Sequence, residues 1–202
     1  MSDLFRKQYV DLATRVERIR LFGKKCLSTI PDRCLADGLT LEVGCGHGHW
    51  LTAYSESNPD YPCIGIDLIT KRIEKSNRKR ERLGLPYLFF FKTEAKEFLE
   101  NLPDSLILKR TVLLFPDPWP KKRHHKRRLL QRPFLDLLAA RSVPNAELCF
   151  RTDHQDYFSW AVEQINCTDS WRIDIEASFP FEHETFFQSI LPEYQTFIAK
   201  LY

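Results

Sequence analysis

The chain has 202 residues, of which 43% are hydrophobic and 28% charged, and its formal net charge is +3. This length and composition predict one globular domain over residues 1–202, with enough chain for a sizeable core, and they exclude wholesale disorder. The charge is uneven: residues 71–82 hold seven Lys and Arg against two Glu, residues 121–128 hold six Lys and Arg, and the rest is acidic. Two basic patches on an acidic chain indicate a polyanionic partner.

Several classes of protein are excluded at this level. The six cysteines form no C-x-x-C pair, so no metal site is expected. No apolar run approaches the roughly 18 residues that a membrane span needs, and no signal-peptide core is visible near the N-terminus. We therefore expect a cytoplasmic protein with no membrane partner.

Residues 1–37 form an N-terminal extension that the pattern defines poorly. A helix is predicted over 9–21, followed by a loop around Pro31 and Asp32. Two placements stay open, since this segment could pack on the domain or lie across a ligand.

From residue 39 onward, strands and helices alternate. Strands are predicted over 39–43, 63–66, 87–91, 111–115, 146–150, 171–175 and 195–201. Helices are predicted over 50–57, 70–83, 94–102, 129–141 and 156–166, with a loop over 180–193. Thr70 is expected to cap one helix and Thr93 to open the next. This alternation predicts an α/β, mostly parallel, doubly wound sheet with helices on both faces.

A glycine-rich turn follows the first predicted strand. Its sequence is Glu42-x-Gly44-x-Gly46-x-Gly48, and Asp67 closes the next strand. A dinucleotide fold would have the spacing G-x-G-x-x-G and a pyrophosphate at the helix N-terminus. Here an acid precedes the glycines; it would repel pyrophosphate and could hold a cationic ligand. The spacing thus argues against a nicotinamide-dependent reductase, although a tight turn without any ligand stays open.

A proline-rich loop follows the strand at 111–115. Three prolines alternate with Asp117 and Trp119, and each proline lacks an N–H group and fixes φ. The loop therefore holds a carboxylate and an aromatic ring at the carboxyl end of a strand, where open α/β sheets bind ligands. The basic residues that follow offer donors to phosphate. Together they suggest chemistry on a nucleotide within a polynucleotide.

Three readings stay open from the residues alone. The basic stretch 71–82 is either a solvated helix face or an extension of an RNA-binding surface. Trp119 either stacks on a base or wedges the loop against the sheet. His124 and His125 lie in a basic run, where they are expected to add phosphate donors rather than to bind metal.

These motifs resemble known families. The glycine turn is similar to motif I of class I S-adenosylmethionine-dependent methyltransferases, which have a Rossmann-like, seven-stranded sheet. The stretch 115–128 resembles the signature of the bacterial tRNA (guanine-N7)-methyltransferases, as do Arg151-Thr152-Asp153 and Thr185-Phe186-Phe187-Gln188. The resemblance implies methyl transfer from S-adenosylmethionine to guanine 46 in the variable loop of tRNA, by a monomer or a homodimer.

The resemblance also implies roles for individual residues. The donor would be contacted by Glu42, Gly44, Gly46, Gly48, Asp67, Glu94 and Asp117, of which Asp117 is the expected catalytic residue. The target guanosine would be contacted by Lys121, Asp153, Thr185, Phe187 and Gln188. The RNA backbone would be contacted by Arg123, His124, His125, Lys126, Arg127 and Arg128.

Two departures concern the last motif. Gln188 stands where the family usually has Glu, and the glycine expected shortly afterwards is missing, with Ile190-Leu191-Pro192 in that region. The amide accepts a hydrogen bond from a guanine edge but lacks the charge. A methyltransferase for another RNA or nucleotide, and a catalytically silent RNA-binding module, therefore stay as alternatives.

Overall fold

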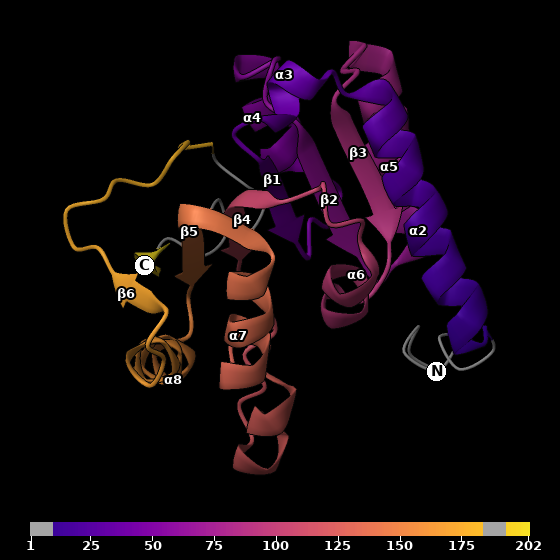
Figure 1. Ribbon diagram of the computed structural model, residues 1–202. Helices are drawn as coiled ribbons and strands as arrows, with labels where there is room; N and C mark the ends of the chain where they lie inside the picture. The colour runs from indigo at the N-terminus through magenta and orange to yellow at the C-terminus, as the bar shows by residue number, and fades with distance from the viewer. Residues whose placement is uncertain (1–9, 184–192) are drawn as a thin grey trace.

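The computed structural model describes residues 10–183 and 193–202, which form a seven-stranded sheet with helices on both faces (Figure 1). The strands are β1 (Leu39–Val43), β2 (Cys63–Asp67), β3 (Leu88–Lys92), β4 (Leu108–Leu114), β5 (Ser142–Thr152), β6 (Trp171–Ile173) and β7 (Gln195–Leu201). Their order is β3-β2-β1-β4-β5-β7-β6. The pairs from β3 to β5 are parallel, and β7 is antiparallel to both β5 and β6. The mostly parallel, Rossmann-like sheet that the sequence predicts is confirmed.

Helices divide between the two faces of this sheet. The helices are α2 (Leu12–Thr29), α3 (Asp32–Leu35), α4 (His49–Ser57), α5 (Thr70–Leu83), α6 (Ala95–Asn101), η2 (Lys122–Arg127, a 3-10 helix), α7 (Arg132–Ala140) and α8 (Gln155–Asn166). One apolar cluster joins the sheet to α2, α6, α7 and α8, and a second joins the other face to α4 and α5. The chain thus follows the predicted doubly wound arrangement.

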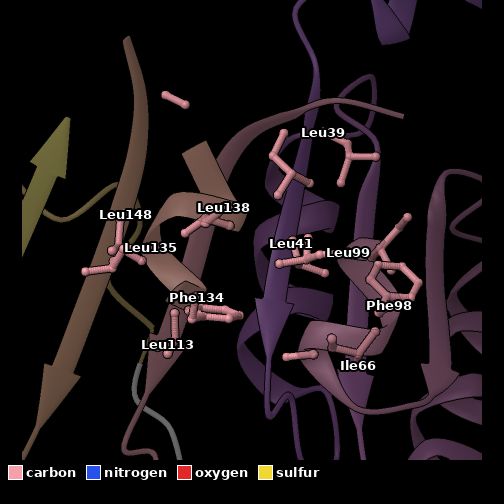
Figure 2. Packing of buried hydrophobic residues seen from close by; sticks show 14 of the residues in the cluster. Leu39, Leu41, Ile66, Phe98, Leu99, Leu113, Phe134, Leu135, Leu138 and Leu148 are labelled. Carbon is pink, nitrogen blue, oxygen red and sulfur yellow. The ribbon is translucent and has the colours of Figure 1, made fainter. Parts of the chain in front are cut away.

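Alternation along the strands decides which residues enter each cluster. In β1, Leu39 and Leu41 point to the side of Phe98 and Leu99 from α6 (Figure 2). Each of these side chains is at most 1% exposed, and a buried Leu or Phe contributes about 1.5–3 kcal/mol. Because successive strand residues face opposite sides, Glu42 lies on the α4 and α5 side.

The N-terminal helix packs on the domain, which answers one of the open questions for the described part of the extension. Phe22 of α2 stacks on Phe91 with ring centroids 4.5 Å apart. Arg15 forms an ion pair with Glu97 of α6 at 3.0 Å. The predicted helix over 9–21 was too short, because the apolar stripe continues through Cys26 to the end of α2.

Other predicted boundaries also change. Helix α3 occupies the predicted loop around Pro31. Strand β5 begins at Ser142 rather than at residue 146, because the strand accommodates Pro144 and Asn145 where its pairing with β4 is irregular. The basic stretch, for which no secondary structure was predicted, contains η2. The expected helix start at residue 129 therefore moves to Arg132.

Candidate active site

The carboxyl edge of the sheet gathers the acids that the sequence analysis selected. Strand β4 pairs with β1 on one side and with β5 on the other. The Phe115 N–H donates to the Arg151 carbonyl at 2.8 Å. Asp117 comes two residues after Phe115, and Asp153 comes two residues after Arg151. Asp67 ends β2, next to β1. Asp67, Asp117 and Asp153 thus lie along one edge, which in open α/β sheets is the ligand edge.

The glycine turn leaves room for a ligand. Gly44 and Gly46 have φ values of +77° and +55°, which L side chains rarely adopt, and a Cβ on either would meet nothing within 4 Å. Gly48 is different, since its Cβ would lie 2.6 Å from the ring of Phe90. The first two glycines therefore border open space, and the third allows α4 to pack closely on the sheet.

Glu42 is the most perturbed acid at this edge. It is 3% exposed, and its Oε2 has no hydrogen-bond partner within residues 10–183 and 193–202. Burial raises the pKa of Glu42 to about 8, an effect that nearby Asp67 increases and the Leu51 N–H opposes. A buried carboxyl oxygen without a partner is costly, and a cationic ligand in the glycine turn would satisfy Glu42 Oε2.

Asp67 connects the glycine turn to the start of α5. Its carboxylate accepts from the N–H of Gly46 at 3.0 Å and of Ile69 at 2.8 Å, and Arg72 lies 3.4 Å away. A carboxylate has about four acceptor sites, so acceptor capacity remains for ligand hydroxyls. Thr70 does not cap α5 as predicted, because Ile69 occupies the N-cap position without a side-chain bond.

Glu94 holds the N-terminus of α6. Its carboxylate accepts from the N–H groups of Lys96 at 3.2 Å and Glu97 at 3.0 Å, so Glu94, rather than Thr93, is the N-cap. This bonding fixes the side chain near the carboxyl end of β3. A role beside the adenine of a donor stays a prediction.

The loop with Asp117 is held in an uncommon conformation. Phe115 and Trp119 have φ values of 49° and 45°, in the left-handed region that large residues rarely adopt. Asp117 lies exposed between them, and its carboxylate has no hydrogen bond or ion pair with any described residue. Strained backbone beside a free carboxylate is typical of ligand-binding loops.

Arg128 is enclosed in a way that the sequence did not suggest. Its side chain is fully buried; it donates to the Pro118 carbonyl at 2.8 Å and forms an ion pair with Asp156. The guanidinium also lies over the rings of Tyr157 at 5.0 Å and Trp160 at 5.4 Å. In this structure the Arg128 guanidinium is enclosed, and its Nη1 has no hydrogen-bond partner among the described residues. A contact of Arg128 with the RNA backbone stays a prediction.

The other basic residues around η2 remain available. The exposed members are Lys121, Lys122, Arg123, Lys126 and Arg127. Trp119 packs against this segment, with the Arg127 guanidinium 4.9 Å from its ring and His124 5.9 Å away, so the loop and the basic segment support each other. His125 is half-buried against Trp160. No cluster of His, Cys, Asp and Glu within the described ranges could hold a metal ion.

Arg151 lies near the carboxyl end of β5, where its side chain is enclosed and paired. It is 3% exposed, lies between the rings of Phe179 at 4.0 Å and Tyr194 at 4.6 Å, and forms an ion pair with Glu182 at 2.7 Å. Asp153, two residues further on, is exposed. The predicted substrate residues Thr185, Phe187 and Gln188 lie outside the described residues.

The sequence missed the enclosure of Arg128. Its partners come from one side of α8, where Asp156, Tyr157 and Trp160 follow the spacing i, i+1, i+4. That spacing was readable as one helical face, but nothing in the sequence indicated that it meets the basic segment.

The sheet order and the acidic, glycine-bearing edge define a class I methyltransferase fold. Among solved structures, the aminoglycoside resistance methyltransferase NpmB1 matches with a TM-score of 0.58 and 17% identity, covering 85% of this chain and 91% of that one. The precorrin-6y C5,15-methyltransferase of Geobacter metallireducens matches with a TM-score of 0.54 and 13% identity, covering 89% and 86%. At identities this low, the similarity shows a shared fold and does not show a shared function.

Sequence relatives identify the family. A family model described as "Putative methyltransferase" matches residues 36–195. The tRNA (guanine-N(7)-)-methyltransferase of Caulobacter vibrioides is 34% identical over 154 residues, 74% of this chain and 68% of that protein. The enzyme of the same name from Thermus thermophilus is 33% identical over 68% of this chain, which spans only 44% of that relative. The chain belongs to the tRNA (guanine-N7)-methyltransferase family.

Proposed function

We propose that the chain transfers a methyl group from S-adenosylmethionine to N7 of a guanine in tRNA, namely guanine 46 of the variable loop. One juxtaposition carries this proposal. The exposed carboxylate of Asp117 lies on a strained loop that follows β4, the strand paired with β1 and its Glu42, and that leads into the exposed cations around η2. This arrangement would bring a donor pocket, a reacting edge and a phosphate-binding surface next to one another.

The donor side fits a ligand that carries positive charge. S-adenosylmethionine would supply a methyl group activated by a sulfonium, together with an ammonium group. Glu42 would face such a cation, the open space beside Gly44 and Gly46 would admit the ligand's chain, and Asp67 would accept from its ribose hydroxyls. The same acids would repel a pyrophosphate, which supports this donor over a dinucleotide.

The acceptor side needs no general base. Guanine N7 carries a lone pair that attacks the methyl carbon directly; the N7–carbon bond forms as the carbon–sulfur bond breaks, and the sulfur keeps the electron pair. The positive charge moves to the purine, where Asp117 and Asp153 would stabilise it and accept from N1–H and the exocyclic amine. The role of the protein is mainly alignment and exclusion of water.

The remaining elements of this proposal concern partners and place of action. tRNA is the proposed partner, bound by the exposed cations around η2. The chain would act in the cytoplasm, as a monomer or a homodimer. No described helix is long and apolar enough to cross a membrane.

The test is methyl transfer from labelled S-adenosylmethionine into unmodified tRNA, followed by nucleoside analysis. We expect labelled 7-methylguanosine at position 46, lost in Asp117→Ala and strongly reduced in Asp117→Asn, which keeps the shape but not the charge. Near-normal turnover of Asp117→Asn with both ligands bound would refute the electrostatic role. A different methylated nucleoside would refute the proposed target. No label and no thermal stabilisation by the donor would favour a silent RNA-binding module.

A further inference from the structure

The outward face of α5 carries a stripe of cations that the proposed active site does not use. Lys71, Lys75, Arg78, Lys79 and Arg82 recur at the spacing that places residues on one side of a helix. The buried residues Ile73 and Ser76 lie on the opposite side, against the sheet. We call these five residues the α5 stripe. With a rise of about 1.5 Å per residue, it extends over roughly 16 Å.

Among the residues that the structure describes, no acid forms an ion pair with these cations, although Glu42 and Glu56 act on Lys79 from further away. The ion pairs of α5 there involve only Arg72 with Asp67 and Arg80 with Glu81, so each member of the α5 stripe lacks an acidic partner. Four of its members line a hollow of about 300 Å³, and no acid joins them there. Like charges at these spacings destabilise a helix slightly. Apart from Lys79, whose ammonium contacts the glycine turn, the members of the α5 stripe have no side-chain hydrogen bond or ion pair with the residues that the structure describes.

The α5 stripe borders the donor side of the proposed site. The Lys79 ammonium donates to the carbonyl of His47 in the glycine turn at 3.0 Å and lies 3.1 Å from His49 Nδ1. Burial, followed by the charges of Lys75, Arg72 and Lys79, lowers the pKa of His47. The positive potential of α5 thus reaches the glycine turn itself.

The two basic surfaces lie on different sides of the sheet. Helix α5 packs on the face with α4, whereas the segment around η2 is attached through Arg128 to α8, on the face with α2, α6 and α7. Between them runs the carboxyl edge, where β2 ends at Asp67 and where Asp117 follows β4. A polyanion that places one nucleotide at this edge has backbone available for both sides.

We propose that the α5 stripe binds the phosphate backbone of tRNA, in a segment separate from the one bound around η2. This inference rests on the proposed function, which places tRNA at the carboxyl edge. RNA is favoured over an anionic membrane surface because the exposed side of α5 offers cations without the apolar face that inserts into lipid. The α5 stripe thereby extends the tRNA footprint across the sheet edge.

The experiment compares two triple variants with the same change in net charge. Lys75→Gln/Arg78→Gln/Arg82→Gln removes three cations of the α5 stripe and spares Lys79, which contacts the glycine turn. The control, Lys24→Gln/Lys25→Gln/Arg33→Gln, removes three exposed cations from α2 and α3, near the opposite edge of the sheet. Binding of an unmodified tRNA transcript is measured across a salt series, together with 7-methylguanosine formation and thermal unfolding.

We expect the α5 variant to bind tRNA about tenfold more weakly at low salt, with the slope of log affinity against log salt reduced by about 2–3. The control should keep the wild-type slope, and both variants should keep the wild-type unfolding midpoint. In NMR titrations, the pKa of His47 should rise in the α5 variant, because Lys75 is gone.

Other outcomes would overturn the inference. If the salt slope of tRNA binding is unchanged in the α5 variant while the wild type still methylates tRNA, the α5 stripe does not bind tRNA, and the proposed function still stands. An equal loss of tRNA affinity in the control variant would mean that net charge, not the α5 stripe, governs binding. Wild type that binds tRNA through α5 but forms no 7-methylguanosine would refute the proposed function and keep the stripe. Wild type without tRNA affinity, or an α5 variant that loses only binding to phosphatidylserine vesicles, would refute the stripe as a tRNA surface.

Discussion

Glu42 is the single residue whose chemistry most directly reports the proposed donor pocket. Its pKa of about 8 in the folded chain exceeds the ordinary value of 4.5, so the folded state holds a proton that the unfolded state releases between these values. The free energy of unfolding without ligand should therefore fall as pH rises from 4.5 to 8. In Glu42→Gln this part of the pH dependence should disappear, and thermal unfolding across that range measures it.

The same substitution should also weaken the binding of S-adenosylmethionine. A hydrogen bond to a charged group is worth about 1.5–3 kcal/mol, so Glu42→Gln should weaken S-adenosylmethionine binding about tenfold or more. Calorimetry in buffers of different ionisation enthalpy should also detect proton release on binding to the wild type near pH 7. Unaltered donor affinity in Glu42→Gln would mean that the ligand does not face this carboxyl.

Because Arg128 is enclosed, we expect its substitution to lower stability without changing phosphate binding. Arg128→Met keeps much of the side-chain volume but leaves the Pro118 carbonyl and Asp156 without their partner, so it should cost on the order of 2–3 kcal/mol and lower kcat. The neighbouring exposed Lys126 is the matched control. Lys126→Met should keep the unfolding midpoint but reduce the salt slope of tRNA binding by about 1, whereas Arg128→Met should leave that slope unchanged. The reverse pattern would restore Arg128 as a phosphate contact.

These residues show what a sequence reveals about a site. The positions of Glu42, Asp67 and Asp117 followed from strand ends, since parallel strands deliver their last residues to one edge. The burial of Arg128 did not follow, because its cause is a contact with α8 from residues about thirty positions later in the chain. The sequence does not distinguish one basic residue of such a run from another. Tertiary contacts decide which of them is buried.

At the scale of elements, α2 is predicted to be a structural part of the domain. Phe22 packs on Phe91 and near Phe98, so Phe22→Ala should cost about 2 kcal/mol, less than for a fully buried ring because Phe22 is only half-buried. The adjacent Leu21 is 55% exposed, and Leu21→Ala should change stability by less than about 0.5 kcal/mol. Urea unfolding of the two variants measures the difference. Equal losses would contradict packing through this face.

Element types were easier to predict than their ends. The seven strands were all found, the first five from apolar runs and the last two from alternating apolar and polar residues, and the mostly parallel pairing followed from the alternation of strands with helices. The ends shifted where tertiary contacts override local signals. Pro144 falls within β5 at an irregular part of its pairing, and η2 forms in the basic stretch, for which no element was predicted. Neither event has a local signature in the residues involved.

At the scale of the molecule, the small net charge conceals two basic surfaces that flank one edge. If the cations around η2 and the α5 stripe bind different phosphates, their contributions to the salt dependence should add, as for distant independent sites. Lys122→Gln/Arg123→Gln/Lys126→Gln should lower the salt slope by about 2–3, and combining it with the α5 variant should lower it by about 4–6. A combined variant no weaker than either parent would mean that both surfaces compete for the same phosphates. Additive slopes, with the unfolding midpoint unchanged, would instead require a polyanion that spans the carboxyl edge, and a folded tRNA with its target guanine at Asp117 meets that requirement.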